Sequence, residues 1–581
     1  MGQHIPQMPA SMAPAPTVTA QAGYQPVAAT QSQSLPSEQL PAGWLPQVLQ
    51  TTDLTVLCLF SVLLITNVPV IAAAGGASFV YWILGFLMFL VPSALVCAQL
   101  YRLFPGEAAV YLWANKALGS FWDTFLGFFC NWWPGALGLT VEAGAFATSL
   151  QALNGSILDT PWKEGAAEIA VLLLAQGLCL VPLRYLRRLF NAIFGAYMVM
   201  FTLVGVAGLI WVSNGHHFQG DISAQGWQIG PANYPVFAIV IVSLLGMAVP
   251  LNAGLEIVHR RHVNRYLLWG TIITIVGYLF ATFGVLAIVP PQDLANPAFI
   301  SELFSSALGS PGVVLGNLTY IIMVLYFICA TAAFNLMFAR LLVVGGVDRR
   351  LPFALQRRTA QGVPLNATMV QTGLNIVFVA ILFFVAPAIA ASDAPLSLAT
   401  FLVTINAAAV VWNIAMIGLF LCGILLCLRY EHVLKGRWIV PPPVFYTAAG
   451  LGVVSALIAI YFTFFAGSPL PDVLNNTDWV FWVLLVVLAS LAVGALYSFL
   501  VPEVEDLVFL LQRTQRVRTA SLGESSSAFT KETYEQANVS HAYPASIPEG
   551  VSAPGGQHLP GQLFSGPISQ PGEREYRNLP R

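Results

Sequence analysis

Long runs of apolar residues recur along this chain from about residue 54 to residue 501, separated by short polar connections. Each run holds about 18 residues or more, enough for an α-helix to cross a hydrocarbon core of roughly 30 Å. The runs lack the alternation over about 10 residues that marks outer-membrane β-strands. They predict twelve transmembrane helices, which we place at residues 54–76, 80–101, 121–150, 166–183, 189–213, 235–257, 267–290, 313–339, 367–390, 397–428, 443–466 and 478–501.

The basic residues orient these helices. Of the 24 Lys and Arg residues, all except Lys163 lie in every second connection or in the segment after residue 501. Connections rich in Lys and Arg are retained on the cytoplasmic side during insertion. The pattern therefore predicts a plasma-membrane protein with both termini in the cytoplasm.

Composition agrees with this architecture. The chain is 57% hydrophobic and 9% charged, with a mean hydropathy of +0.74, whereas soluble proteins average about 25% charged residues. All seven cysteines fall inside apolar runs, where they read as small apolar side chains and not as a disulfide or metal framework. We expect an all-α polytopic membrane protein that holds no metal and no cofactor.

The two ends of the chain differ from its centre. Residues 1–50 contain no Lys or Arg and are rich in Pro, Ala, Gln, Ser and Thr, which predicts a disordered cytoplasmic arm. After the twelve-helix domain at 51–501, residues 502–519 are acidic first and basic last with an apolar stripe. This pattern is typical of a short amphipathic helix at the inner membrane surface. We expect residues 520–581 to form a disordered cytoplasmic tail.

Two of the predicted helices are interrupted in similar ways. The first contains Thr66-Asn67-Val68-Pro69 near its middle, and the sixth contains Gly246-Met247-Ala248-Val249-Pro250-Leu251-Asn252. Proline frees a backbone carbonyl in a helix, and unpaired backbone survives in a membrane only where it is buried in protein or lines a cavity. One isolated proline is more often a simple kink. Paired interruptions at corresponding places in two halves instead point to a transporter's binding site. The predicted substrate-binding residues are Thr66, Asn67, Val68, Pro69, Gly246, Met247, Ala248, Pro250 and Asn252.

Several segments resemble the amino acid–polyamine–organocation (APC) superfamily of permeases over essentially all twelve helices. The segment FPGEAAVY at 104–111, after Arg102, is similar to the family pattern F-P-x-x-G-G-x-Y. The segment from Arg340 to GVDRRLP at 346–352 and the basic entry to helix five at 184–191 are similar to two further family segments. The resemblance implies two inverted five-helix repeats, helices 1–5 and 6–10, plus two extra helices.

The resemblance also implies roles for the interrupted segments. Thr66, Asn67 and Val68 match a family segment whose backbone binds the substrate carboxylate, and the carbonyls of 246–250 would hold the amino group. This chain departs from the family at both places. Asn67 stands where the family usually has a small residue. Leu245-Gly246-Met247 stands where an aromatic residue followed by glutamate is common.

Charged and polar residues inside the helices suggest how transport could be coupled to an ion. Glu142 is the only acidic residue well inside a predicted helix, so we expect it either to carry a proton or to be a neutral, hydrogen-bonded structural carboxyl. Thr331 and Asn335 lie where the fold's sodium site would be, although such residues often bond only their own helix. Coupling to H⁺ or Na⁺, or simple exchange, remains open at this point.

At the cytoplasmic end of helix six, Glu256 precedes Arg260 by four residues. The simplest expectation is a surface ion pair between them. The alternative is an inner gate formed by Arg102 and Glu256. His259 and His262 have no third ligand nearby in the sequence, so a zinc site is not expected.

These features predict a secondary transporter that moves amino acids or related amines across the bilayer. We expect the substrate at the interrupted helices and alternating access by movement of helices 1, 2, 6 and 7 against 3, 4, 8 and 9. The alternative is a non-transporting membrane sensor of a small amino compound. No hydrolase or metalloprotease motif and no P-loop is present, so neither an enzyme nor an ATP-driven pump is expected. A small molecule and the lipid bilayer are the expected partners, without nucleic acid.

Overall fold

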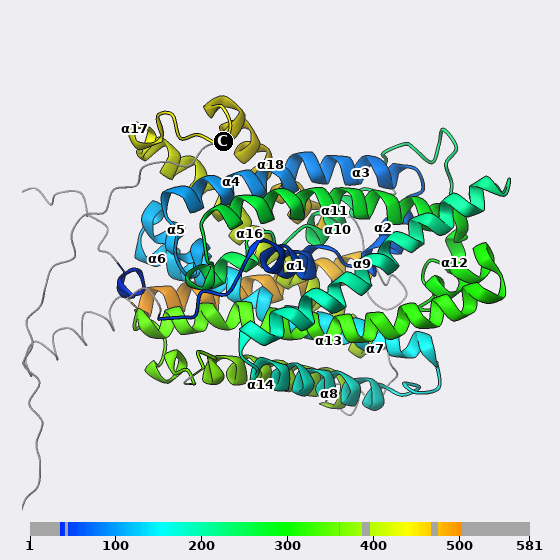
Figure 1. Cartoon of the computed structure of the whole chain (residues 1–581), viewed down its shortest axis with the longest axis horizontal. Coiled ribbons are helices and arrows are strands. Elements are labelled where there is room, and N and C mark those ends of the chain that lie inside the picture. Colours follow the sequence, from blue (N-terminus) through cyan, green and yellow to red (C-terminus); the bar gives the residue numbers. More distant parts are fainter. Residues whose placement is uncertain are drawn as a thin grey trace, which may run out of the picture. The chain divides into compact units, whose positions relative to one another are not determined.

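The computed structural model describes residues 35–40, 44–231, 233–359, 361–385, 395–465 and 475–501, and in 395–400 the backbone alone. Throughout these residues the regular elements are helices (Figure 1). One isolated bridge, between Leu49 and Ile257, pairs two extended segments. The expected amphipathic helix at 502–519 and tail at 520–581 lie outside the described residues.

Within this part of the chain, eight helices are long and apolar enough to cross a membrane. They coincide with predicted helices two, five and seven to twelve. Two of them contain more than one element. Helix two is formed by α3 (Ala77–Gly85), a π-helical turn η2 (Phe86–Leu90) and α4 (Val91–Leu103), and in helix nine α14 (Leu365–Ala380) continues into the π-helical turn η7 (Ile381–Val385). The others are α9 (Leu183–Ser213), α11 (Arg261–Ile288), α13 (Ser310–Val347), α16 (Pro395–Arg429), α18 (Pro442–Phe465) and the helix Asn476–Val501.

The other four predicted helices are present but are less regular or less apolar. Helix one consists of α1 (Thr51–Val62) and α2 (Asn67–Ala72), and helix six of α10 (Pro235–Ser243) and the 3₁₀ helix η4 (Val249–Glu256). Helix three is formed by α6 (Ser120–Trp122), the π-helical η3 (Asp123–Phe129) and α7 (Cys130–Leu153), and helix four is α8 (Pro161–Cys179). The chain is therefore an all-α polytopic membrane protein, as its hydrophobic pattern predicts.

Short helices fill the connections. These are η1 (Pro36–Gln39), α5 (Ala109–Leu118), η5 (Pro291–Asp293), α12 (Phe299–Leu308), η6 (Phe353–Gln356) and α17 (Glu431–Leu434).

The helices form an inner set and an outer set. In α13, 72% of an apolar stretch of 18 residues is buried, whereas 22% of the corresponding stretch is buried in the helix Asn476–Val501. The helix α13 is therefore central, and Asn476–Val501 is peripheral. The first segment of helix one, α1, contacts α9, α11 and α13 (Figure 1). Figure 1 also shows α8 and α14 side by side, as their contacts confirm. The broken helices thus sit among the long straight ones, which provide their rigid surroundings.

Part of the N-terminal arm has a defined place, contrary to the expectation of disorder over 1–50. The backbone N–H and the hydroxyl of Ser37 donate to the two carboxylate oxygens of Asp348, at 2.7 and 2.9 Å. Glu38 forms an ion pair of 2.7 Å with Lys116. The Arg358 guanidinium stacks over the Trp44 ring at 4.2 Å from its centroid. The composition of the arm did not reveal these contacts because each one needs a partner far away in the sequence.

Glycines allow α9 and α11 to approach closely. A Cβ atom added at Gly284 would lie 2.2 Å from the backbone oxygen of Val204, and one at Gly208 would lie 2.7 Å from the Cα of Gly284. Small residues at helix contacts are the usual means of close packing in membranes, where no hydrophobic force drives helices together.

We therefore expect Gly284→Ala to force α9 and α11 apart and to destabilise the protein by about 1–3 kcal/mol, the usual cost of overpacking. Thermal unfolding of the detergent-purified protein would show a lower melting temperature. Gly195→Ala, also in α9, is the matched control because a Cβ there meets no atom within 4 Å. An equal melting temperature for the two variants would contradict the close approach.

Candidate functional site

Helix one is interrupted between Val62 and Asn67. Leu63 leaves the helical conformation, with φ −111° and ψ 78°. Pro69 lies in the first turn of α2, where a missing backbone donor is tolerated. The sequence-predicted interruption of helix one is confirmed, and its unwound residues directly precede Asn67.

Three tyrosines on other helices bond the backbone that this interruption frees. The Tyr278 hydroxyl donates to the carbonyl of Val62 at 2.6 Å and accepts from the N–H of Leu64 at 3.1 Å. The Tyr197 hydroxyl donates to the carbonyl of Leu63 at 3.1 Å and accepts from the N–H of Ile65 at 2.9 Å. Tyr326 donates to the same Leu63 carbonyl at 3.3 Å. We call Tyr197, Tyr278 and Tyr326 the tyrosine clamp.

The clamp is itself a packed unit. The rings of Tyr197 and Tyr326 stack with centroids 3.8 Å apart, and all three side chains are buried. They come from α9, α11 and α13, which are predicted helices five, seven and eight. The side chain of Asn67 also has a hydrogen-bonding interaction with the Tyr278 hydroxyl. The sequence analysis missed the clamp, because tyrosines in apolar helices carry no local signal of what they bond.

Helix six is interrupted over a longer stretch. It leaves the α-helical path after Ser243 and resumes as the 3₁₀ helix η4 at Val249. Gly246 has φ +118°, and a Cβ atom there would lie 2.5 Å from the Cβ of Ser61 in α1. Glycine is therefore required at this point both by the backbone conformation and by the close approach to helix one.

The two interruptions meet. Besides the contact of Gly246 with Ser61, the Cys58 sulfur lies 3.4 Å from the Met247 sulfur. The Tyr266 hydroxyl donates to the Met247 carbonyl at 3.2 Å. Met247 therefore packs toward helix one and helix seven.

A small cavity lies beside the helix-six interruption. Of the predicted binding residues, Gly246 and Ala248 line it, together with Val249. Its other walls are residues that the sequence analysis did not select: Val110, Asn131, Trp412, Ala415 and Met416. These come from α5, helix three and helix ten, so only the tertiary structure could have identified them.

The remaining predicted binding residues do not line this cavity. Thr66 and Asn67 are half-buried, whereas Val68 and Pro69 are buried. Pro250 is buried within η4. Asn252 is also buried there, and neither polar atom of its side chain has a hydrogen-bond partner among the described residues.

Glu142 of α7 lies within electrostatic range of the tyrosine clamp. Its carboxylate is 2% exposed, and its Oε2 has no hydrogen-bond partner in the described part of the chain. Its charge acts on Tyr197, Tyr278 and Tyr326. The one isolated intramembrane charge of the sequence is thus brought to the interruption of helix one. A buried carboxylate without a cationic partner is costly, and such residues commonly mark a binding or ion pathway.

The sequence analysis missed another buried carboxylate, that of Glu168. Glu168 of α8 is 1% exposed, and its Oε2 is likewise unbonded within the described residues. A Cβ added at Gly144 would lie 3.4 Å from its Oε1, so Glu168 packs on helix three. Its position near the beginning of a predicted helix suggested a place at the membrane surface.

Thr331 and Asn335, the candidate sodium ligands, direct their donors elsewhere. The Thr331 hydroxyl donates to the Phe327 carbonyl of its own helix at 2.8 Å. The Asn335 amide donates to Gln176 at 3.1 Å and to the Thr372 hydroxyl at 2.8 Å, which ties α13 to α8 and α14. These bonds support structural roles for both residues.

The predictions that Glu256 pairs with Arg260 or with Arg102 are wrong. Its carboxylate forms a buried ion pair with Arg340 of α13, and neither Arg260 nor Arg102 takes that place. Arg102 instead donates to the backbone carbonyl of Arg437 at 3.4 Å. An i,i+4 pair with Arg260 requires a continuous helix, and the chain leaves the helical path at Ile257, whose ψ is 122°.

An arginine in each of the two other family-like segments forms a similar ion pair. Arg350 of the 346–352 segment contacts Asp123 at 2.6 Å. Arg187, at the entry to helix five, contacts Asp53 at 2.9 Å. Each arginine therefore joins a carboxylate at the predicted cytoplasmic end of another helix. This explains physically why these positions are basic and why the charges are not simply at the surface.

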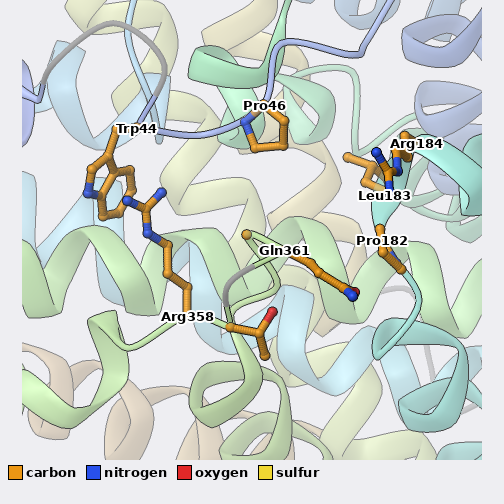
Figure 2. Close-up of a pocket in the computed structure, with 9 residues that line it drawn as sticks. Trp44, Pro46, Pro182, Leu183, Arg184, Arg358 and Gln361 are labelled. Atoms are coloured by element: carbon orange, nitrogen blue, oxygen red, sulfur yellow. The ribbon is translucent and has the colours of Figure 1, made fainter.

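The larger cavity lies elsewhere. A groove of about 610 Å³ lies between the N-terminal arm and two connections. Figure 2 shows the Arg358 guanidinium of this groove next to Trp44. Pro46, Pro182 and Arg184 also line it. None of its residues belongs to the interruptions of helices one and six, so it is not the predicted substrate site.

The fold and the site thus define a polytopic helical membrane protein whose first and sixth helices are both interrupted and meet beside a buried carboxylate. A family model described as amino acid permease matches residues 49–491. The chain belongs to this family, within the APC superfamily.

Individual relatives are distant. The probable agmatine/putrescine antiporter AguD of Lactococcus lactis is 22% identical over 266 residues, which cover 42% of this chain and 52% of that protein. An uncharacterized transporter of Legionella pneumophila is 20% identical over 358 residues, covering 57% of this chain and 74% of that protein. The chain spans about half the length of the first of these relatives.

Removing one hydroxyl of the clamp tests its role. In Tyr278→Phe the buried Val62 carbonyl loses its donor and the half-buried Leu64 N–H loses its acceptor. An unsatisfied buried group costs about 1–3 kcal/mol. We expect a lower melting temperature for the detergent-purified protein. Tyr461→Phe is the control, because Tyr461 is 57% exposed in α18. Unchanged melting of the Tyr278 variant would show that the helix-one backbone does not depend on the clamp.

Proposed function

We propose that this protein is a secondary transporter of amino acids or related amines. The observation that carries the proposal is the meeting of two interrupted helices near the buried Glu142 carboxyl, which forms no ion pair among the described residues. The family membership supports it independently. Such a centre offers carbonyl oxygens and one negative charge, which are the groups that bind an ammonium.

The hydrogen bonds of the clamp favour an amino group at helix one over a carboxylate. The N–H groups of Leu64 and Ile65 are already bonded to tyrosine hydroxyls. The Leu63 carbonyl already accepts from both Tyr197 and Tyr326. The Val62 carbonyl accepts from Tyr278, and its second lone pair remains able to accept from a substrate ammonium. Glu142 would balance the positive charge. This reverses the roles that the family resemblance implies for helix one.

The cavity beside helix six measures about 10 Å³, room for about one water molecule, so it would have to widen to hold the rest of the substrate. Gly246 and Ala248 offer backbone, Asn131 offers an amide, and Trp412 and Met416 offer apolar contact. Substrate would bind at this centre while helices 1, 2, 6 and 7 move against 3, 4, 8 and 9. The agmatine/putrescine antiporter among the relatives supports amines as the substrate class.

Coupling and location complete the proposal. The transporter would lie in the plasma membrane with both termini in the cytoplasm, as the basic connections predict. Glu142 is the candidate proton carrier, since a proton and a substrate ammonium would compete for the same carboxylate. Coupling to sodium at Thr331 and Asn335 is the alternative: a sodium ion binds oxygen lone pairs, and the Asn335 Oδ1 has no hydrogen-bond partner among the described residues.

Flux through proteoliposomes tests the transport function. The full-length protein should take up radiolabelled putrescine, agmatine or a neutral amino acid above the level of empty liposomes, and unlabelled substrate inside should accelerate uptake if the protein exchanges. Thermal stabilisation by a compound that shows no flux in either format would contradict transport and favour a sensor.

Glu142→Gln tests the role of the carboxylate. A neutral amide binds neither a proton nor an ammonium as an ion, so we expect substrate uptake to fall by about tenfold or more, as for the loss of a buried charged contact. The residual uptake should lose its pH dependence. Glu302→Gln, in an exposed connection, controls for removal of an acid. A wild-type rate and pH profile in the Glu142 variant would leave this carboxyl structural.

A further inference from the structure

The predicted cytoplasmic end of helix six is a junction of several segments. We define the helix-six junction as residues 252–258 with the loop 104–108. The Ala108 N–H donates to the Asn252 carbonyl at 3.2 Å, and the Leu255 N–H donates to the Glu107 Oε2 at 2.7 Å. A Cβ added at Gly254 would lie 1.8 Å from the Gly106 carbonyl oxygen, so the two backbones touch.

The N-terminal arm covers the same end. The N–H groups of Val48 and Leu49 both donate to the Glu256 carbonyl at 2.9 Å. The Val258 N–H donates back to the Leu49 carbonyl at 3.1 Å. In this state of the protein, the loop 104–108 and the arm therefore close around the last turn of helix six.

The charges buried in the junction do not balance. It contains two buried carboxyl groups, Glu107 and Glu256, and the buried guanidinium of Arg340 reaches into it from α13. Arg340 pairs with the Oε1 of Glu256. The Oε1 of Glu107 and the Oε2 of Glu256 have no hydrogen-bond partner among the residues that the structure describes. An uncompensated buried charge is strongly unfavourable, so one carboxyl must bind a proton or the junction must open.

We propose that Glu107 is a proton-binding site, and that loss of its proton releases the loop 104–108 from the end of helix six. Glu256 is paired with Arg340, whereas Glu107 accepts a hydrogen bond from the Leu255 N–H and forms no ion pair among the described residues. The neutral carboxyl still accepts that bond through its carbonyl oxygen. The ionised carboxylate faces Glu256 and lacks a cation of its own.

The neighbouring groups allow the direction of the pH effect to be derived. Burial raises the pKa of Glu107 to about 8, opposed by Arg340 and the Leu255 N–H and reinforced by Glu256. Tyr101 of α4 also faces this carboxyl, and Arg260 acts on Tyr101. Once the loop is released into water, the pKa should return toward its ordinary 4.5.

The closed junction then binds one more proton than the open one between about pH 4.5 and 8. Its stability is complete below this window and decreases as the pH rises through it. Each pH unit within the window should favour opening by about tenfold, and the effect should level off above about pH 8. The inference depends on the proposed function only in identifying this opening with access from the cytoplasm.

Hydrogen–deuterium exchange of the full-length protein in nanodiscs tests the proposal. The amides of Ala108 and Leu255 report the junction directly, because each donates across it. After correction for intrinsic exchange rates, the protection of peptides covering 104–112 and 252–258 should fall with rising pH as derived above. Glu107→Gln imitates the protonated carboxyl, so it should keep these peptides protected at every pH.

Two further variants set the limits of the measurement. Gly254→Ala should expose both peptides at all pH values, because its methyl group collides with the loop. Glu302→Gln should follow the wild type. Wild-type pH dependence in Glu107→Gln would overturn the assignment of the proton, and loss of protection at every pH would show that the carboxylate charge itself holds the junction. Hydrogen–deuterium exchange does not depend on substrate flux, so its result is independent of whether the protein transports a substrate.

Discussion

The structure depends on one requirement: a backbone that leaves the helical path inside a membrane must find hydrogen-bond partners within the protein. Helix one meets it through three tyrosine hydroxyls from three other helices. Helix six meets it partly through Tyr266 and partly through loops at its end. The helices α9, α11 and α13 are therefore more than a scaffold. They supply the tyrosine hydroxyls that bond the freed backbone of helix one inside the membrane.

The same requirement places the chemistry. Unwinding provides carbonyls that accept from a cation, and close approach of Gly246 to Ser61 brings the two unwound segments together. Glu142 adds a carboxyl group near this centre, where the clamp hydroxyls already donate to the helix-one carbonyls. At the predicted cytoplasmic end, buried arginine–carboxylate pairs hold the connections to the helix ends. Within the helix-six junction, Glu107 forms no ion pair among the described residues, and this makes the junction sensitive to the protonation of Glu107.

Much of the fold could be predicted from local pattern. The apolar runs match the helices closely, and both interruptions occur where Asn67-x-Pro69 and Pro250-x-Asn252 indicate them. The site was predicted less well. Gly246 and Ala248 line the cavity, but Asn131 and Trp412 come from helices with no distinguishing motif. Glu256 was assigned a partner four residues away, whereas its partner Arg340 is 84 residues distant.

The sequence by itself determined the all-helical membrane class and the two points of interruption, because hydrophobicity and proline act through local and bilayer physics. Only the tertiary structure decided which side chains bond the freed backbone, which cation each buried carboxylate receives and which receives none. Those outcomes depend on distances between helices that are remote in sequence. A tyrosine or a glutamate looks the same in a sequence whether it faces lipid, another helix or a substrate.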